Sequence, residues 1–287
     1  MTHMVSNAQT EPPRTQLAED SAQACSFMLE LSPDWLVLRA SENSHGFLGE
    51  YPARLIGEPL SSFTLAQPLH DLRNSLSRQR SSNGIARAYR TRLTAEPRFF
   101  DIAFQQVDGR LLLEGLPSSN DGFGDSLGAV SRLIDGLAGD THAALLDNAA
   151  RRLRALTGFD RVTVTLQGEN KKQFESSRSQ FRTPASARVM PAIVADAAAE
   201  PVGLYPAAKP QSIAQALLRG LSGAERYELQ VNGIRSVLSV PLVRQGRELG
   251  HVRCESQAAR TPSLELHAAA ELFTQMVAVE LDRLLAD

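Results

Sequence analysis

Two stretches with the pattern of an antiparallel hairpin, one in each half of the chain, constrain the fold more than any other feature. In the first, apolar residues alternate over 100–104, and Asp108-Gly109 separates two strand-like runs. Asp-Gly is typical of a type I′ turn, which needs positive φ at both central residues. In the second, a β-branched run over 236–243 is followed by the turn Gln245-Gly246 and another run over 248–254. Both halves are therefore expected to contain antiparallel strands.

Turn-forming and low-periodicity segments divide the chain. A length of 287 residues corresponds to about two domains of ordinary size. Residues 1–20 have no apolar periodicity and are expected to form a flexible tail. A turn-rich stretch over 118–124 has the composition of a linker. The expected domains are therefore 21–117 and 125–287.

Apolar residues at helical spacing predict the helices. One is expected over 67–80 in the first domain, and others are expected over 127–137, 145–156, 213–221 and 263–285 in the second. Asp140-Thr141 is suited to cap the start of the 145–156 helix, and Gly158 is suited to end it. The predicted fold class is α+β, with two domains that each contain an antiparallel sheet flanked by helices.

The composition excludes several classes of protein. The chain has 30 basic and 32 acidic residues, so no excess of charge points to nucleic acid or an anionic membrane as the partner. It contains no apolar run of about 18 residues, and its first 20 residues lack the core of a signal peptide. Two cysteines are too few for a disulfide framework, which favours a reducing cytoplasm. No phosphate-binding loop, nucleophile elbow or kinase signature is present, and we expect no enzymatic activity.

The order of these features resembles the PAS and GAF domains of phytochromes. The first domain carries the resemblance in 35–38, in the run Ala40-Ser41-Glu42-Asn43, in 55–60 and in the hairpin over 100–114. The second domain carries it in 153–162, with the run Thr157-Gly158-Phe159-Asp160-Arg161-Val162, and in 232–240 and 249–254. The resemblance implies a PAS domain over 21–117 followed by a GAF domain over 125–287.

This resemblance implies a bilin photosensor, so the attachment site of the bilin is the first position to compare. Bacterial phytochromes attach biliverdin to a cysteine just ahead of the PAS domain, and Cys25 lies in that region. A thiolate there could add to a vinyl group of the bilin. The segment between this cysteine and the first strand is shorter than in the family, and 31–35 stands where phytochromes carry Ile-Gln-Pro-His-Gly.

The departures from the family pattern gather at the bilin pocket. Pro184-Ala185-Ser186 matches the start of the family motif Pro-Ala-Ser-Asp-Ile-Pro, but the rest of the motif is missing. Glu225 stands at the place of a pocket histidine, and Cys254-Glu255-Ser256 stands where the family has Cys-His-His. Carboxylates at these places would lie near the bilin propionates, which is unfavourable. The resemblance therefore implies an eroded site, whose pocket positions in this chain are Asp160, Arg161, Glu225 and Ser256.

Three hypotheses follow. The first is a phytochrome-like signalling module with an eroded chromophore pocket and no cofactor, which acts by dimerisation and partner contact. The second is a biliverdin-binding red/far-red photoreceptor attached through Cys25. The third is a GAF receptor for another small ligand, such as haem or a nucleotide.

The helices at the two ends of the second domain supply the expected contacts with partners. In the family such helices pack across a homodimer and pass signals to an output domain or partner protein. The positions in this chain that the resemblance places at the dimer interface are Leu127, Leu133, Phe273, Met276 and Val277. The alternative is that each apolar stripe packs on the sheet of its own domain.

Overall fold

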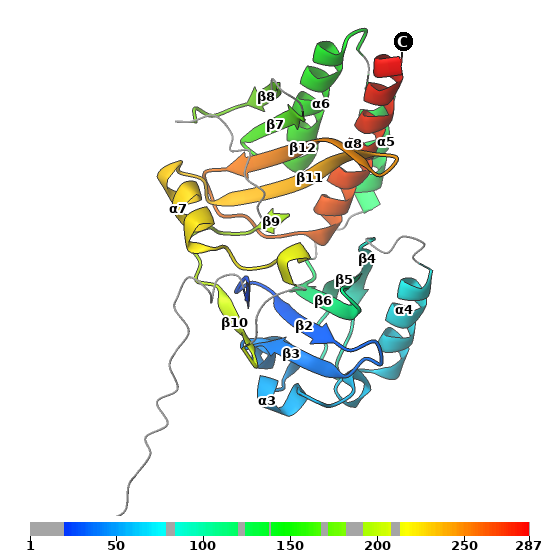
Figure 1. The fold of residues 1–287 in the computed structure, drawn as a ribbon, viewed down its shortest axis with the longest axis vertical. Coiled ribbons are helices and arrows are strands. Elements are labelled where there is room, and N and C mark those ends of the chain that lie inside the picture. The colour runs from blue at the N-terminus through cyan, green and yellow to red at the C-terminus, as the bar shows by residue number, and fades with distance from the viewer. Residues whose placement is uncertain are drawn as a thin grey trace, which may run out of the picture.

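The computed structural model of the protein describes residues 20–78, 84–119, 124–137, 139–167, 172–181, 192–207 and 213–286. They form two domains stacked along the long axis of the molecule (Figure 1). The N-terminal domain is built on a seven-stranded sheet and the C-terminal domain on a five-stranded sheet. The strand pairs of both sheets are antiparallel, and helices flank each sheet, so the predicted fold class is confirmed.

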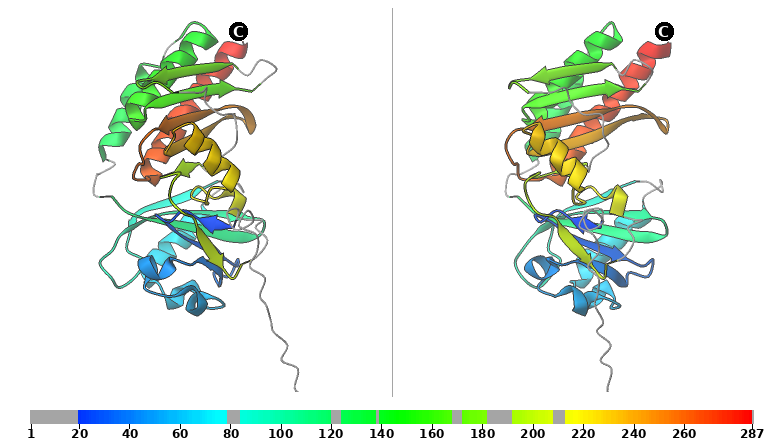
Figure 2. Two further views of the ribbon diagram at one scale, coloured as in Figure 1. Left: turned by 90° about the vertical axis from the view of Figure 1, so that its left-hand side faces the viewer. Right: turned by 60° about the vertical axis from the view of Figure 1, so that its left-hand side comes forward.

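The N-terminal sheet has the strand order β1-β10-β3-β2-β6-β5-β4. The strands from the first half of the chain are β1 (Ser21–Ala22), β2 (Phe27–Leu31), β3 (Val37–Ser41), β4 (Ala86–Thr91), β5 (Phe100–Val107) and β6 (Arg110–Pro117). The short helices are α2 (Ser44–Leu48), α3 (Pro52–Leu55) and the 3₁₀ turn η1 (Leu60–Ser62), and the longer helix is α4 (Ala66–Ser77). These helices lie on the face of the sheet that points away from the C-terminal domain (Figure 2).

The predicted hairpin joins β5 to β6. Asp108 and Gly109 have φ of 49° and 75°, as a type I′ turn requires. Both strands are buried along nearly their whole length instead of on alternate residues. The reason is that the sheet is covered on both faces. Phe100 packs toward the helices of its own domain, whereas Ala103 packs against Leu217 and Leu264 of the second half.

The C-terminal sheet has the strand order β8-β7-β12-β11-β9. Its strands are β7 (Arg161–Leu166), β8 (Gln173–Ser177), β9 (Ile193–Val194), β11 (Ser236–Arg244) and β12 (Arg247–Ser256). The helices of this half are α5 (Gly124–Asp135), α6 (His142–Thr157), the 3₁₀ turn η2 (Ile213–Gln215), α7 (Gly223–Val231) and α8 (Leu264–Ala286). Helices α5, α6 and α8 lie together on one side of the sheet, and α7 lies on the other side (Figures 1 and 2).

Helix α6 begins and ends as its sequence predicts. The Thr141 hydroxyl accepts a hydrogen bond from the Ala144 N–H at 3.2 Å, which satisfies one of the unpaired amides of the first turn. Gly158 ends the helix in the left-handed conformation with φ of 66°.

The apolar stripe of α8 packs on the sheet of its own domain. Phe273 and Val277 are completely buried in the core of the C-terminal domain. A partner could reach these two side chains only if the domain opened, so their packing favours the alternative in which the stripe covers the sheet of its own domain. Leu133 and Met276 are half-buried, and the side chain of Leu127 lies outside the described part of the chain.

The two domains share strands. Strand β10 (Val202–Tyr205) comes from the second half of the chain but pairs with β3 and β1 in the N-terminal sheet. On its other side β1 is bonded to the segment after η2, because the Gly220 N–H donates to the Ser21 carbonyl at 2.7 Å. Asp20, expected to end the flexible tail, is buried and forms an ion pair with Arg39. The N-terminal sheet is therefore larger than the 21–117 segment.

The segment 213–221 does not form the expected helix. Only the η2 turn is helical, and the chain then runs beside β1. Partners outside the segment hold its amides: the Glu114 carboxylate accepts from the N–H of Leu217 and of Leu218 at 3.0 and 2.7 Å. An amide bonded in this way cannot also close an α-helical turn, so tertiary contacts override the local periodicity.

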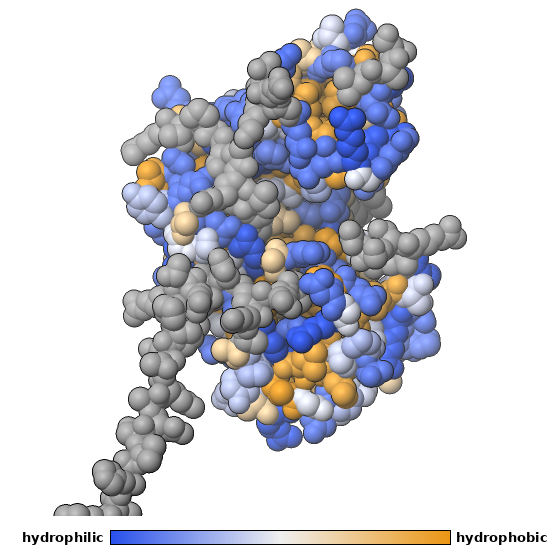
Figure 3. Space-filling model, viewed as in Figure 1, coloured by the Kyte–Doolittle hydropathy of each residue, from blue (hydrophilic) through white to orange (hydrophobic). Residues whose placement is uncertain are grey.

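The surface seen in Figure 3 is a mosaic of polar and hydrophobic residues, and hydrophobic surface reaches the waist between the domains. Among the residues that the structure describes, no helix combines the length and the apolar character needed to cross a membrane.

Candidate functional site

The C-terminal sheet has one apolar face and one polar face. Along β7 and β12, residues with apolar side chains alternate with residues whose side chains are polar, as the two-residue period of a strand requires. The apolar set packs against α6 and α8 and consists of Val162, Val164, Val252 and Cys254. The alternate set is the polar face, which we define by Arg161, Thr163, Thr165, Arg253 and Glu255, and all five are buried.

Glu255 lies between two arginines on the polar face. One of its carboxylate oxygens accepts from Arg161 Nε at 2.7 Å, and the other accepts from Arg253 Nε at 2.7 Å. The side chains of all three residues are no more than 2% exposed. The Arg161 guanidinium also lies over the ring of Phe181, 4.0 Å from its centroid. Charges this deep need partners, because an unpaired buried ion carries a large desolvation cost.

A second carboxylate completes the balance of charge. Glu175 on β8 lies 4.0 Å from a terminal nitrogen of Arg161 and is 43% exposed. The two arginines of the polar face are therefore matched by two carboxylates. On this face the Thr163 hydroxyl is buried and has no hydrogen-bond partner among the residues that the structure describes.

Two of the predicted pocket residues, Asp160 and Ser256, lie together at the edge of the polar face. The Asp160 N–H donates to the Ser256 hydroxyl at 3.2 Å, and the Asp160 carboxylate accepts from Arg178 Nε at 2.9 Å and from the Gln257 N–H at 3.1 Å. Burial opposes ionisation of Asp160, but these hydrogen bonds outweigh it and hold its pKa below the ordinary value. Asp160 thus joins the start of β7 to the end of β12.

Glu225 belongs to the N-terminal cap of α7. Its carboxylate accepts from the Ser222 N–H at 2.7 Å, and its own N–H donates to the Ser222 hydroxyl, which forms a capping box. The same carboxylate forms a two-point ion pair with Arg219 at 2.9 and 2.6 Å. Burial opposes ionisation, but the hydrogen bonds from Arg219 and Ser222 keep the pKa of Glu225 below its usual range. The two carboxylate oxygens of Glu225 therefore accept hydrogen bonds from Ser222, at the start of α7, and from Arg219, in the segment beside β1.

Cys25 lies just before β2 and packs at the edge of a hydrophobic cluster shared by the two domains. A cavity of about 60 Å³ adjoins it, lined by residues that include Gln23, Asp196 and Glu200. Burial, opposed by a backbone hydrogen bond, raises the pKa of the Cys25 thiol to about 11. The thiol is therefore protonated near neutral pH, and the protonated form is a weak nucleophile.

The structure brings together only part of the predicted pocket. Asp160 and Ser256 are hydrogen-bonded and Arg161 is next to them in β7, whereas in the described chain Cys25 and Glu225 make no hydrogen bond to Asp160 or Ser256. The prediction missed that Glu255 pairs with both Arg161 and Arg253. The available signal was the alternation of β12, which places Arg253 and Glu255 on one face of the sheet. The cross-strand neighbour of Glu255 is Arg161, which lies on the same face.

The described part of the polar face leaves little positive charge for an acidic ligand. An acidic ligand needs positive charge that is left uncompensated, and here Glu255 and Glu175 already match the two arginines. Nor do the described residues contain a group of three or more histidine, cysteine or acidic side chains placed to hold a metal ion.

Comparisons with known proteins agree with this architecture. A family model described as PAS fold matches residues 23–116, and one described as GAF domain matches residues 141–281. Cyanobacterial phytochrome B of Nostoc sp. is 24% identical over 276 residues, which cover 86% of this chain and 37% of that protein. A bacteriophytochrome of Pseudomonas aeruginosa is 24% identical over 290 aligned residues, which cover 90% of this chain and 38% of that protein. The chain thus spans less than two fifths of the length of these curated relatives.

Solved structures share the fold over almost the whole chain. The chromophore-binding domain of an unusual bacteriophytochrome from R. palustris matches with a TM-score of 0.74 and 22% identity, and the match covers 96% of this chain and 98% of that one. The photosensory core module of a Stigmatella aurantiaca phytochrome matches with a TM-score of 0.77 and 23% identity, covering 98% of this chain and 61% of that one. The chain is therefore a phytochrome-like PAS–GAF module, in which a PAS domain is followed by a GAF domain.

Proposed function

We propose that this PAS–GAF chain is a sensory and signal-transduction module that works without a covalently bound bilin and acts through dimerisation and contact with a signalling partner or output domain. The observation that carries the proposal is the buried Arg161–Glu255–Arg253 cluster. Together with Glu175 beside Arg161, it fills the polar face of the GAF sheet with two positive and two negative charges that compensate one another. A bilin with two propionates would have to compete with Glu255 for both arginines.

Cys25 supports the same proposal from the PAS side. A thiol with a pKa of about 11 is thiolate in only about one molecule in ten thousand at pH 7, so its attack on a vinyl group would be slow. The cavity beside it, about 60 Å³, is far smaller than the several hundred Å³ of a typical cofactor site. Both facts disfavour attachment of a tetrapyrrole at this place.

The rival function is a biliverdin photoreceptor attached through Cys25, and it is favoured by relatives whose names include the words phytochrome and chromophore-binding domain. Mixing the purified protein with biliverdin separates the two. On our proposal no red-absorbing band appears, and no zinc-dependent fluorescence stays with the denatured chain. A stable red band with covalent fluorescence, lost in Cys25→Ala and retained in Cys254→Ala, would overturn the proposal and establish the rival.

The same preparation tests the third hypothesis, a GAF receptor for haem or a nucleotide. On our proposal, denaturing the purified protein releases neither compound. The absorption spectrum and mass spectrometry of the released material measure this. A stoichiometric amount of either compound would replace our proposal by the receptor hypothesis.

The signalling part of the proposal rests on the helices of the GAF domain. Because Phe273 and Val277 are in the core, the proposed dimer uses the more accessible residues of α5 and α8: Leu133 and Met276 are half-buried, and Leu272 is 40% exposed. We expect sedimentation velocity at micromolar concentration to give a dimer, and a monomer would contradict this part of the proposal. The two free cysteines agree with action in a reducing cytoplasm.

A further inference from the structure

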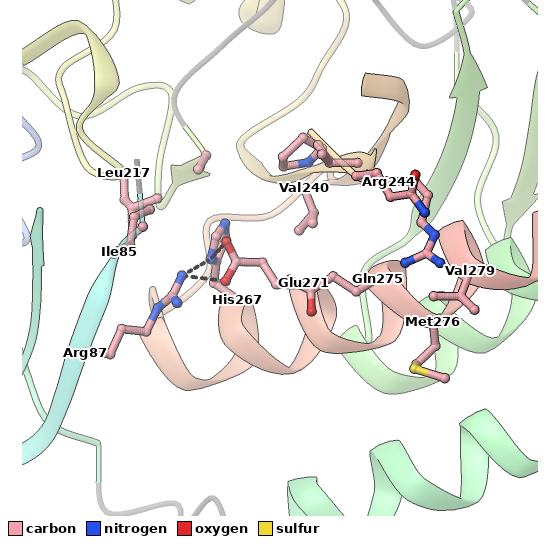
Figure 4. Close-up of a pocket in the computed structure, with 15 residues that line it drawn as sticks. Ile85, Arg87, Leu217, Val240, Arg244, His267, Glu271, Gln275, Met276 and Val279 are labelled. Atoms are coloured by element: carbon pink, nitrogen blue, oxygen red, sulfur yellow. Dashed lines mark hydrogen bonds and ion pairs between the residues drawn. The ribbon is translucent and has the colours of Figure 1, made fainter. Parts of the chain in front are cut away.

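A polar contact joins the PAS sheet to α8 at one end of a cleft of about 730 Å³ between the two domains. Figure 4 shows this cleft along α8, with Ile85 and Arg87 of the PAS domain closing one end. Arg87 belongs to β4, the outermost strand of the N-terminal sheet, which is bonded to β5 on one side. The contact therefore ties an edge strand of one domain to the C-terminal helix of the other.

Three side chains form this contact, and we call them the latch: Arg87, His267 and Glu271. Arg87 donates to the Glu271 carboxylate at 2.7 Å and to His267 Nδ1 at 3.1 Å, and both partners are on α8 (Figure 4). His267 Nε2 lies 3.2 Å from the Ser239 carbonyl of β11. Because a carbonyl can only accept, Nε2 carries the ring hydrogen, and Nδ1 has the lone pair that accepts from Arg87. The latch as observed requires a neutral His267.

The latch has a second way to pair its charges. One oxygen of Glu271 lies 3.7 Å from His267 Nδ1. A proton added to Nδ1 would end its acceptance from Arg87, place two positive groups side by side and provide an N–H for Glu271. Glu271 can therefore pair with Arg87 or with a charged His267.

The surroundings of His267 favour the neutral ring. Its side chain is 1% exposed. This burial is the main reason that the pKa of His267 lies below its ordinary value of 6.5; Glu271 opposes the shift, Arg87 adds to it, and the hydrogen bond to Ser239 opposes it. A group that binds its proton more weakly in the closed latch than in an open one shifts the equilibrium toward the open latch as the pH falls.

Glu114 on β6 is the other titrating group that acts on Arg87. Burial raises its pKa to about 7, although the Leu217 and Leu218 amides and Arg87 oppose this. Its protonation removes a negative charge near Arg87 but leaves the hydrogen bonds of Arg87 to α8 in place. Acid therefore reaches the latch itself through His267.

The remaining ionisable groups of these elements act elsewhere or do not titrate near neutral pH. Tyr89 on β4 has a pKa that burial raises to about 12, so it stays neutral. The charges that act on Glu265, earlier on α8, are PAS-domain groups outside the latch. On β11, Arg244 pairs with Asp282 near the other end of α8.

We propose that the latch is a proton-sensitive device: acidification charges His267, displaces Arg87 and releases β4 from the first turns of α8. The domains stay attached, because the joint of β1 with the segment ending at Gly220 and the packing of Leu264 against Ala103 do not involve His267. What changes is the restraint that the PAS sheet places on α8. This inference goes beyond the proposed function and does not depend on whether a bilin binds.

Nitrogen-15 NMR of the wild-type imidazoles tests the charge state. At pH 7.5 we expect His267 to be the neutral tautomer with its hydrogen on Nε2, and we expect it to become charged as the pH falls from 6.5 to 5. In Arg87→Met this charging should move to higher pH, because Arg87 disfavours the charged ring. A charged ring at pH 7.5, a hydrogen on Nδ1 at that pH or a ring still neutral at pH 5 would overturn the proposal.

Hydrogen exchange measured by mass spectrometry tests the opening. Peptides from β4 and from the first turns of α8 are compared between wild type and His267→Gln at the same pH, so that the intrinsic effect of pH on exchange cancels. Glutamine can donate to Ser239 and accept from Arg87, but it cannot become charged. We expect equal exchange at pH 7.5 and about tenfold faster exchange in the wild type at pH 5.

Two further variants complete the test. His251→Gln removes a half-buried histidine of β12 whose pKa is also lowered, and as the matched control it should exchange like the wild type at both pH values. Arg87→Met should exchange fast at both, because its latch cannot close. Equal exchange of folded wild type and His267→Gln at pH 5 would overturn the proposal, and so would wild-type protection in Arg87→Met at pH 7.5. If His267→Gln failed to fold, the wild-type NMR titration would still decide.

Discussion

At the scale of single residues, Glu255 decides the electrostatics of the polar face. A neutral histidine at this place would leave Arg161 and Arg253 with positive charge for an acidic ligand. A carboxylate bonded at 2.7 Å to each of them, together with Glu175 beside Arg161, compensates that charge within the protein. Glu255 therefore joins the two arginines in a buried ionic cluster, and the proposed absence of a bound bilin rests on this cluster.

Glu114 carries the clearest pH dependence. Burial, only partly offset by the Leu217 and Leu218 amides and by Arg87, raises its pKa from 4.5 to about 7. The folded state therefore binds this proton more tightly than the unfolded state. The resulting stability is complete below about pH 4.5 and is lost as the pH rises through about 7, a change of about 3 kcal/mol at most.

We expect Glu114→Gln to remove this dependence, because glutamine cannot ionise. Urea unfolding at several values between pH 5 and pH 8 would measure it as the difference in unfolding free energy between wild type and variant. The unfolding free energy of the wild type should fall relative to that of the variant as the pH rises. His251 and His267, whose pKa values burial lowers, act with the opposite sign and lose stability as the pH falls, but they cancel in the difference.

The matched control for this experiment is the exposed Glu96→Gln, for which we expect a difference that is flat with pH. If Glu114→Gln kept the wild-type slope, the assignment of the titration to Glu114 would be wrong.

At the scale of elements, the β5–β6 turn offers a test of backbone conformation alone. Gly109 has φ of 75°, and a Cβ atom there would meet nothing within 4 Å. Gly109→Ala should therefore cost about 1–2 kcal/mol, which is the penalty of the left-handed conformation without any steric clash. Thermal or urea unfolding would measure it.

Gly128→Ala is the matched control, since Gly128 lies inside α5 and a Cβ there would be 3.6 Å from the nearest atom, on the Arg132 side chain. It should stabilise the protein by up to about 1 kcal/mol, because alanine favours a helix more than glycine does. A neutral or stabilising Gly109→Ala would rule out the type I′ turn.

Elements with a strong local signal were predictable, and those held by distant partners were not. The hairpins and the 263–285 helix follow from turn residues and apolar period, and the structure places them within a few residues of the prediction. The 213–221 segment has the same kind of apolar spacing, but Glu114, more than 100 residues away in the chain, takes its amides. Local periodicity contains no information about such a partner.

At the scale of the whole molecule, the β1 segment joins the two domains. Ser21 and Ala22 lie between β10 and the segment ending at Gly220. The Gln23 side chain continues this joint, because its oxygen accepts from the Ala195 N–H at 2.9 Å and its amide nitrogen donates to the Ile193 and Arg219 carbonyls.

We expect Gly220→Ala to loosen this joint. A Cβ atom at Gly220 would lie 2.0 Å from the Ser21 hydroxyl oxygen and 2.9 Å from Pro201 Cβ, so the segments must move apart. Overpacking of this kind costs about 1–3 kcal/mol. Urea unfolding would measure the loss, and limited proteolysis should show faster cleavage near residue 20.

Gly223→Ala provides the matched control three residues further on, where a Cβ meets nothing within 4 Å at the start of α7, and it should be neutral. Equal effects of the two substitutions would show that β1 is not tightly enclosed at Gly220.

The sequence by itself determined the two domains, the α+β class, most of the helices and strands, and the resemblance to phytochromes, because these depend on residue periods, turn residues and short motifs that act over a few positions. Only the tertiary structure decided which residues meet. It joined Glu255 to Arg161 across two strands, bonded Glu225 to Arg219, buried Phe273, and inserted β10 of the second half into the first sheet. These outcomes depend on competition between distant groups for the same charges, amides and buried volume, and that competition is settled only when the whole chain is packed.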